Sequence, residues 1–198
     1  MTSIEPVVAL AAFAFAASIT PGPNNMVLAA SGATFGFRRT VPCMLGTGVG
    51  FAALILAAGI GGELLLSAVP WLESALRFVG TAYLLYLAWR IATAGRAEAK
   101  GGTRPVTFWE AAAFQFVNPK GVGVAISAHA AFRIPELGAA GSVLTVTLVF
   151  ALVSILSICA WAGLGTTAGR FLRSDRALRA FNLVLGGLTA ASAALLFL

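Results

Sequence analysis

The chain has 198 residues, of which 59% are hydrophobic and only 10% are charged, and its formal net charge is +6. Because soluble domains carry about 25% charged residues, this composition excludes a water-soluble protein and indicates an integral membrane protein. The two cysteines, Cys43 and Cys159, lie far apart without a CxxC pattern, so the sequence predicts free thiols rather than a disulfide or a metal site.

Apolar segments of bilayer length follow one another along the whole chain. One crossing needs about 20 residues, and six segments reach this length with short connections between them. The second and the fifth contain no charged residue. The sequence therefore predicts an all-α integral membrane protein with six transmembrane helices, over residues 7–30, 41–62, 71–93, 107–132, 140–164 and 179–197.

The basic residues predict the orientation of these helices. They concentrate in the connections after the first, third and fifth helices, whereas the opposite side has Arg133 beside Glu5, Glu63 and Glu136. Since cytoplasmic loops carry the excess of Lys and Arg, both termini are expected in the periplasm. The pI of 10.4 then reflects topology and attraction to anionic lipid rather than nucleic-acid binding. The basic residues on the expected cytoplasmic side are Arg38, Arg39, Arg90, Arg96, Lys100, Arg104, Arg170, Arg173, Arg176 and Arg179.

Prolines interrupt two of the predicted helices. Pro21 and Pro23 lie inside the first, and Pro119 lies inside the fourth. A proline inside a helix costs about 3 kcal/mol and frees a backbone carbonyl, which in hydrocarbon must face protein or a wet cavity. Gly22 and Lys120 are each midway along their segment, so both breaks are expected near the bilayer midplane.

The two breaks occupy corresponding places in the two halves of the chain. Three crossings per half force the halves into opposite orientations, and a broken helix in each half is typical of inverted-repeat transporters with a midplane site. The sequence thus predicts one transmembrane domain over residues 1–198, with repeat one at 1–96 and repeat two at 104–198. The alternative is a pair of ordinary proline kinks in an unrelated bundle.

Each break is expected to expose the N-terminus of the half-helix that follows it, where free N–H groups attract anions. Asn24 and Asn25 add uncharged donors and acceptors at the first break, and Asn118 and Lys120 stand at the second. A lysine in the middle of a membrane costs about 3 kcal/mol or more. A ligand carboxylate is therefore its expected counter-ion.

Few other ionisable residues lie inside the predicted helices. The alternative partners of Lys120 are Glu73, Glu110 or backbone carbonyls. Glu73 and Arg77 are spaced i, i+4 near the outer end of the third helix, which suits an intrahelical ion pair or an outer gate. Glu110 marks the cytoplasmic interface or, like Glu73 and Arg77, is a candidate for coupling or gating. The only histidine, His129, is interpreted as structural rather than as a proton relay.

Several blocks of sequence carry a family resemblance. They are TPGPNN in the first helix, GFRR after it, AYLLYLAW at the end of the third and NPKG in the fourth. On these blocks, and across essentially the whole chain, the sequence resembles the LysE/RhtB family of amino-acid exporters. TPGPNN, FW followed by FQFVN, and CAWAG are most similar to the cysteine/O-acetylserine exporter branch.

The resemblance implies a multi-pass carrier of the bacterial inner membrane that exports a neutral amino acid or close derivative, of the cysteine/O-acetylserine or threonine/homoserine type, driven by the proton gradient. No cofactor is expected, and the expected partners are the substrate, protons and the lipid bilayer; a homo-oligomer is compatible with the sequence. The family's important blocks are TPGPN and NPK. With Asn25 added from the chemistry of the first break, the expected substrate-binding residues are Thr20, Pro21, Gly22, Pro23, Asn24, Asn25, Asn118, Pro119 and Lys120.

A zwitterionic substrate agrees with the chemistry of the breaks. Lys120 and two half-helix N-termini supply an anion site, and the substrate ammonium needs carbonyls freed by the prolines or asparagine oxygens. The scarcity of deep carboxylates argues against a dibasic substrate and against a divalent metal. The competing interpretations are a channel, an accessory membrane subunit without transport of its own, and an intramembrane enzyme, whose nucleophile–base pair or metal cluster the sequence does not suggest.

Overall fold

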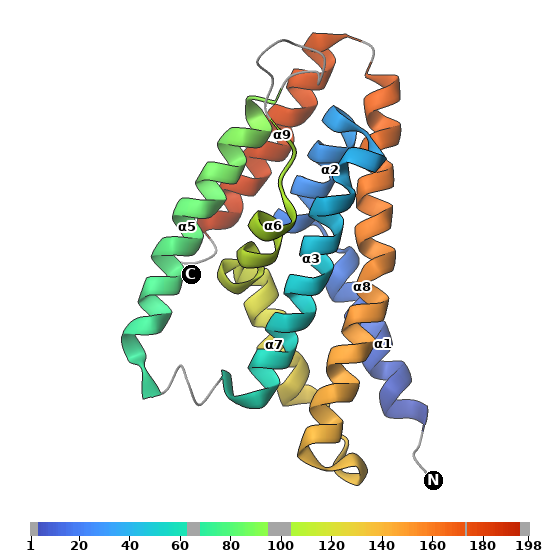
Figure 1. Ribbon diagram of the computed structural model, residues 1–198, viewed down its shortest axis with the longest axis vertical. Helices are drawn as coiled ribbons and strands as arrows, with labels where there is room; N and C mark the ends of the chain where they lie inside the picture. Colours follow the sequence, from blue (N-terminus) through green and yellow to red (C-terminus); the bar gives the residue numbers. More distant parts are fainter. Residues whose placement is uncertain (1–3, 63–67, 95–103, 173, 195–198) are drawn as a thin grey trace.

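The structure is a computed structural model that describes residues 4–62, 68–94, 104–172 and 174–194 (Figure 1). Every regular element in these residues is helical and none is a strand, so the predicted all-α class is confirmed. Short π-helical or 3-10 segments are η1 (Ala58–Gly62), η2 (Gln115–Val117) and η3 (Pro135–Leu137). The α-helices are α1 (Ile4–Ile19), α2 (Pro23–Phe35), α3 (Phe37–Ala57), α5 (Pro70–Ala92), α6 (Phe108–Phe114), α7 (Pro119–Ala131), α8 (Gly138–Phe171) and α9 (Asp175–Ala194).

The first predicted break separates α1 from α2, which are bent by 58° relative to each other. Gly22 is extended, with φ −173° and ψ 173°, and Pro23 follows as the first residue of α2. Proline suits this position because its missing N–H would have no partner inside the helix, and because its ring already holds a helical φ. The TPGP block therefore ends one helix and starts the next within a few residues.

The second predicted break lies between α6 and α7. The 3-10 turn η2 follows α6 directly, and Asn118 then leaves the helical conformation with φ −80° and ψ 112°. α7 starts at Pro119. A residue before proline is disfavoured in the helical region, which explains why the chain leaves the helix at Asn118 rather than at the proline itself. Both interruptions that the prolines predict are present.

Two of the described helical segments are long and apolar enough to cross a membrane by themselves, namely Phe37–Gly61 and Pro135–Phe171. The pair α1–α2 becomes a third if its two halves form one bent span. Length and composition therefore identify two or three crossings in the described chain. The count of six and the inverted repeat stay predictions.

α8 is longer than the sequence predicts. Its apolar segment was expected to end at residue 164, but the helix continues to Phe171. In this extension Gly165 and Gly169 lie against the main chain of α2 at Ala29 and Ala33, where an added Cβ would overlap backbone atoms. Close contact between the two helices explains the extra length, because small residues let backbones approach and pack.

The remaining helices pack in pairs around this contact. α5 runs along α9, and α3 contacts both α6 and α8 (Figure 1). Gly46 and Gly50 of α3 lie against the main chain of α6, at Phe108 and Ala112. This contact holds the short α6, and with it the second break, against the long helix α3.

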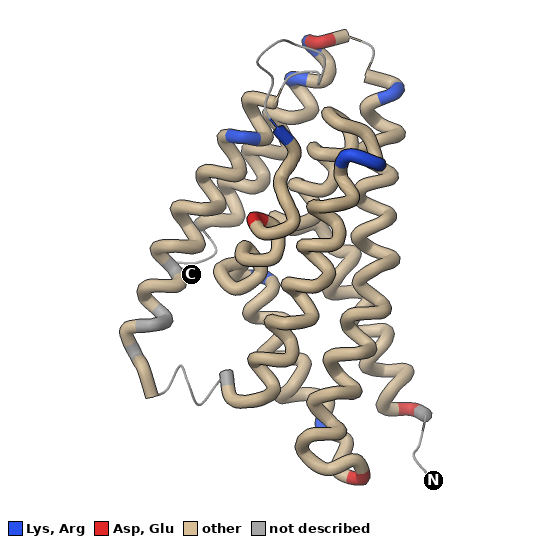
Figure 2. The backbone as a smooth tube through the Cα atoms, viewed as in Figure 1, with Lys and Arg blue, Asp and Glu red and all other residues tan. Residues whose placement is uncertain are grey.

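Charge is distributed unevenly along the bundle. In Figure 2 most of the described lysines and arginines gather towards the end where α8 passes into α9, and the long middle of the helices is almost free of charge. The basic residues that concentrate in alternate connections of the sequence therefore lie mostly at one end of the bundle.

Gly165→Ala is expected to destabilise the protein, because the new Cβ would overlap the Ala29 carbonyl on α2. Overpacking of this kind costs about 1–3 kcal/mol. Thermal unfolding in detergent, followed by size-exclusion chromatography, measures the loss. Gly163→Ala is the matched control on the same helix, since nothing lies within 4 Å of its added Cβ. Equal unfolding temperatures for the two variants would contradict the close α2–α8 contact.

Candidate functional site

Lys120 joins the two breaks directly. Its Nζ, at the start of α7, donates to the carbonyl oxygen of Thr20 at 2.6 Å and to the Thr20 hydroxyl at 2.8 Å. A Cβ added to Gly22 would lie only 2.8 Å from Cδ of Lys120 and 3.3 Å from its Nζ. Gly22 is therefore needed for space, because the lysine side chain occupies the volume that another side chain would fill.

A second contact between the breaks is a reciprocal pair of side-chain amides. Asn24 donates its Nδ2 to Oε1 of Gln115 at 2.6 Å, and Gln115 donates its Nε2 to Oδ1 of Asn24 at 3.0 Å. Gln115 is completely buried and also donates to the carbonyl of Ala111 at 2.8 Å. Gln115 is not among the residues predicted for the site, although an amide in the apolar FQFVN block just before the break is a usable signal.

The last carbonyl groups of α1 are paired with side chains instead of with their own helix. Asn25 donates its Nδ2 to the carbonyls of Ser18 and Thr20, at 2.9 and 2.8 Å. Asn25 is 6% exposed, so both bonds form inside the protein. The amide of the second half-helix therefore caps the end of the first.

α8 supplies two further donors to the same helix end. Ser157 donates its Oγ to the Ser18 carbonyl at 2.7 Å, and Trp161 donates its Nε1 to the Ile19 carbonyl at 3.1 Å. These carbonyls were expected to be available to a substrate ammonium, but the structure pairs them with protein donors. The other predicted acceptor for the substrate ammonium is an asparagine side-chain oxygen.

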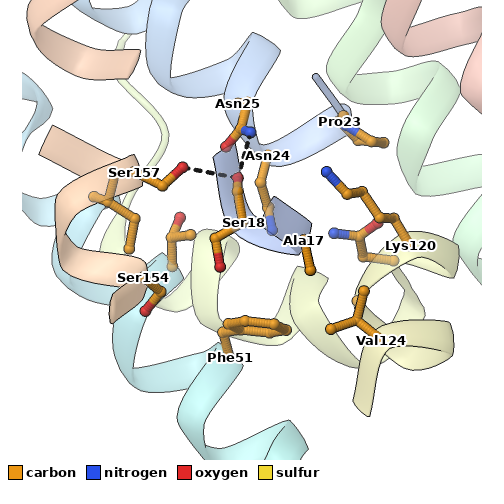
Figure 3. A pocket seen from close by; sticks show the side chains of 15 residues that line it. Ala17, Ser18, Pro23, Asn24, Asn25, Phe51, Lys120, Val124, Ser154 and Ser157 are labelled. Carbon is orange, nitrogen blue, oxygen red and sulfur yellow. Dashed lines mark hydrogen bonds between the residues drawn. The ribbon is translucent and has the colours of Figure 1, made fainter. Parts of the chain in front are cut away.

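A small cavity lies between the two breaks (Figure 3). Its volume is about 50 Å³, which is room for roughly three to five water molecules. No residue of its lining is acidic. The lining comes from α1, α2, α3, α7, α8 and the break residues, and consists of Ala17, Ser18, Gly22, Pro23, Asn24, Asn25, Thr47, Phe51, Asn118, Lys120, Gly121, Val124, Ser154, Ser157 and Ile158.

Two polar atoms in the cavity lining have no hydrogen-bond partner. Among the described residues, three buried side-chain atoms are unpaired: Oγ of Ser18, Oδ1 of Asn118 and Oδ1 of Asn182. The first two residues line the cavity, and Asn118 is only 2% exposed. Because buried polar atoms almost always have a partner, unpaired ones mark a place where water or a ligand belongs.

The electrostatic character of the cavity is positive. Lys120 is half-buried, and its recorded partners are the uncharged oxygens of Thr20. α2 and α7 both begin at the cavity, and the first N–H groups of a helix have no partner within it. These N–H groups and the lysine together favour an anionic group.

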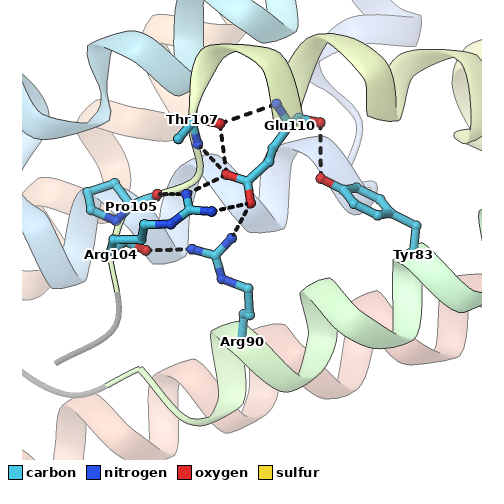
Figure 4. Close-up of polar contacts among 6 residues, drawn as sticks. All are labelled: Tyr83, Arg90, Arg104, Pro105, Thr107 and Glu110. Atoms are coloured by element: carbon cyan, nitrogen blue, oxygen red, sulfur yellow. Dashed lines mark hydrogen bonds and ion pairs between the residues drawn. The ribbon is translucent and has the colours of Figure 1, made fainter. Parts of the chain in front are cut away.

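Glu110 lies in a separate polar cluster at the start of α6 (Figure 4). Its carboxylate accepts from Arg90 at 3.0 Å and from Arg104 at 2.7 and 2.8 Å. It also accepts from the N–H and hydroxyl of Thr107, which completes a capping box. Tyr83 donates its hydroxyl to the Glu110 carbonyl at 3.0 Å. The hydrogen bonds with Glu110 raise the pKa of Arg104 above its ordinary value.

Lys120 contacts one of its three predicted protein partners, a backbone carbonyl, which is that of Thr20. A second predicted partner, Glu110, is bound by two arginines instead. The side chains of Glu73 and Arg77 lie outside the described residues. A role for Glu73, Arg77 or Glu110 in coupling or gating stays a prediction.

His129 makes a contact that suits the structural interpretation. Its ring Nε2 lies 2.8 Å from the carbonyl oxygen of Ile55. Since a carbonyl only accepts, Nε2 carries the hydrogen of this bond. The histidine thereby ties α7 to the end of α3, and Gly59 leaves space for its ring.

The family model of the LysE type translocator matches residues 15–198. The chain belongs to the LysE translocator family. A cysteine/O-acetylserine efflux protein of Salmonella paratyphi A is 35% identical over 157 residues, which are 79% of this chain and 80% of the relative. The protein of the same name from Escherichia coli O1:K1 is 33% identical over 169 residues, 85% of each chain. No solved structure matches.

Membership settles the class of the protein. LysE translocators and the efflux proteins among their relatives are transporters, so this translocator is a transporter of the membrane and not an enzyme. The predicted site residues of this translocator come together at the breaks, where Thr20, Gly22, Pro23, Asn24, Asn25, Asn118 and Lys120 contact one another or line the cavity. Pro21 and Pro119 shape the breaks from beside it, and Pro21 is exposed.

Asn24→Leu and Gln115→Leu are each expected to destabilise this translocator by about 1–3 kcal/mol, because each leaves the partner amide without this hydrogen bond inside the bundle. The double variant is expected to lose less than the sum, since it removes both partners. Thermal unfolding of the four proteins in detergent gives the coupling energy. Strictly additive losses would mean that the amide pair does not hold the breaks together.

Proposed function

We propose that this translocator exports a neutral amino acid or close derivative, of the cysteine/O-acetylserine or threonine/homoserine type, from the cytoplasm by alternating access around the cavity between the breaks. Efflux of cysteine and O-acetylserine is what the names of the Salmonella and Escherichia relatives state for those proteins. The proposal rests on two groups that line the same cavity. One is Lys120, for which the lining offers no acidic partner, and the other is Oδ1 of Asn118, a buried acceptor that has no donor.

These two groups complement an α-amino acid. The ammonium of Lys120 binds the substrate carboxylate, and the unpaired Oδ1 of Asn118 accepts from the substrate ammonium. A carboxylate is a stronger acceptor for lysine than the Thr20 carbonyl and hydroxyl, because its bond is charge-assisted on both sides. Substrate binding therefore replaces the contact between Lys120 and Thr20 and loosens one of the links between the breaks.

The lining supports a neutral and short substrate. A second ammonium group would find no carboxylate among the lining residues. The cavity has room for only a few water molecules, which favours a substrate with a short side chain.

The proposed architecture is the six-helix inverted repeat, with repeat one at residues 1–96 and repeat two at 104–198. In it α1–α2 and α6–α7 are the two broken spans, one from each repeat. The hydrogen bonds of Lys120 with Thr20 and of Asn24 with Gln115 support it, because they join the two breaks at the same level of the bundle. Movement of one repeat against the other would open the cavity to either side.

The proposed location is the bacterial inner membrane, with both termini in the periplasm. The gathering of lysine and arginine at one end of the bundle supports this orientation (Figure 2). Export is proposed to use the proton gradient, with Glu73, Arg77 and Glu110 as candidates for coupling or gating.

The test is efflux from proteoliposomes loaded with radiolabelled O-acetylserine, cysteine, threonine, homoserine or lysine, with and without an imposed proton gradient. Gradient-dependent, saturable efflux of one or more of the neutral compounds, and none of lysine, is expected. Counterflow separates a carrier from a channel, since a channel shows neither saturation nor counterflow. Efflux at the same rate with and without the proton gradient would contradict proton coupling.

Lys120→Ala is expected to lower the apparent affinity for the transported amino acid about 10- to 100-fold, because a charge-assisted hydrogen bond to the carboxylate is lost. Concentration-dependent efflux measures this change. Arg170→Ala, which removes an exposed arginine outside the cavity, is the matched control. Normal affinity in Lys120→Ala would contradict the carboxylate site.

Alkaline phosphatase fused after residue 198 is expected to be active, and the same enzyme fused after residue 100 is expected to be inactive. The enzyme needs disulfides, which form in the periplasm and not in the cytoplasm. Activity is measured in intact cells, with immunoblots to compare the amounts of fusion protein. The reverse pattern would invert the orientation, and equal activity would contradict an odd number of crossings between the two points.

A further inference from the structure

The hydroxyl of Ser18 has no role in the contacts that hold the breaks together. The Ser18 carbonyl accepts from Asn25 and Ser157, but its Oγ is buried and has no hydrogen-bond partner. Ser18 lines the cavity between the breaks. The side chain is therefore a polar group in the cavity wall that the fold leaves unpaired.

Neighbouring hydroxyls show that this is unusual. Thr20 donates to the Ala17 carbonyl at 3.1 Å, Ser154 to the Ala151 carbonyl at 3.1 Å, and Thr166 to the Ala162 carbonyl at 2.8 Å. Bonds of this kind, to a carbonyl three or four residues earlier, are the usual way for a helical hydroxyl to be satisfied in an apolar interior. Ser18 lies in the last turn of α1 and does not make one.

An unpaired hydroxyl in such a place costs free energy unless something else bonds to it. An alanine would avoid that cost and would keep the Ser18 carbonyl, which is the part that the break uses. The partner of Oγ is therefore to be found among the occupants of the cavity.

The direction of the side chain separates it from the charged part of the site. In Figure 3 the Ser18 hydroxyl points towards the wall that Phe51 and Ser154 form, and Lys120 lies across the cavity. An amino acid held by its carboxylate at Lys120 and by its ammonium at Asn118 has its side chain left for the remaining wall. The lining also includes Val124 and Ile158, which are apolar.

We infer that Ser18 selects the substrate by its side chain: its hydroxyl hydrogen-bonds a hydroxyl, thiol or ester oxygen on a short side chain. This inference rests on the proposed function and narrows its substrate class. Short purely aliphatic amino acids fill the same space but leave Oγ unpaired, so they are poorer substrates.

The test compares substrates of nearly equal volume that differ in one polar atom. Cysteine and serine each have 2-aminobutyrate as an aliphatic counterpart, and threonine has valine. Efflux from proteoliposomes gives the ratio of transport efficiencies, Vmax/KM, within each pair. The wild-type protein is expected to prefer the polar member about tenfold or more, as a site that hydrogen-bonds its substrate does.

Ser18→Ala is expected to bring these ratios close to one, by slowing the polar substrates and leaving 2-aminobutyrate and valine unchanged or faster. Ser192→Ala is the matched control, because it removes a helical hydroxyl that bonds the protein's own backbone and lies outside the cavity. The control is expected to keep the wild-type ratios. Size-exclusion chromatography and thermal unfolding confirm that the variants are folded.

Other results would overturn the inference. If Ser18→Ala slows both members of each pair equally, Ser18 is structural. If the ratios do not change, water satisfies the hydroxyl and the substrate does not contact it. In both cases wild-type efflux of amino acids leaves the proposed function standing. If the wild-type protein transports none of these compounds, the proposed function fails and the inference fails with it.

Discussion

The structure depends on the pairing of backbone groups at a helix that is broken inside an apolar bundle. Away from water, an unpaired carbonyl is expensive, so a break can persist only where other groups reach it. Three parts of the chain do so at the end of α1: Asn25 from α2, Lys120 from α7, and Ser157 with Trp161 from α8. Each of these bonds fixes the position of another helix relative to the break. The cavity between the breaks is the space that they enclose.

The same pairing explains why so few groups remain for a ligand. Most polar atoms around the breaks are used to hold the breaks together: the amides of Asn25 and Gln115 bond backbone carbonyls, and the amide of Asn24 bonds that of Gln115. What remains is one cation whose partner is uncharged and two oxygens without partners, on Asn118 and Ser18. Under the proposed function, substrate recognition falls to the few groups that are not used to hold the breaks together.

The breaks and their lysine could be predicted from the sequence because proline acts locally and because a charge inside a long apolar segment is conspicuous. Contacts between distant residues could not be predicted, since they depend on how the helices pack. Gln115 is an example, because its role exists only once Asn24 lies opposite it. Glu110 is another, because its two arginines come from α5 and from the residues before α6. The end of α8 was placed too early, since hydropathy does not register the glycines that pack against α2.

The fluorescence of Trp161 can report on the first break. The other tryptophans, Trp71, Trp89 and Trp109, are 60–78% exposed, whereas Trp161 is half-buried and its indole donates to the carbonyl of Ile19. Indole emission responds to hydrogen bonding and to the polarity of its surroundings. The protein therefore contains a native fluorophore attached to the end of α1, and with the exposed tryptophans replaced its emission would report on movement of that helix end.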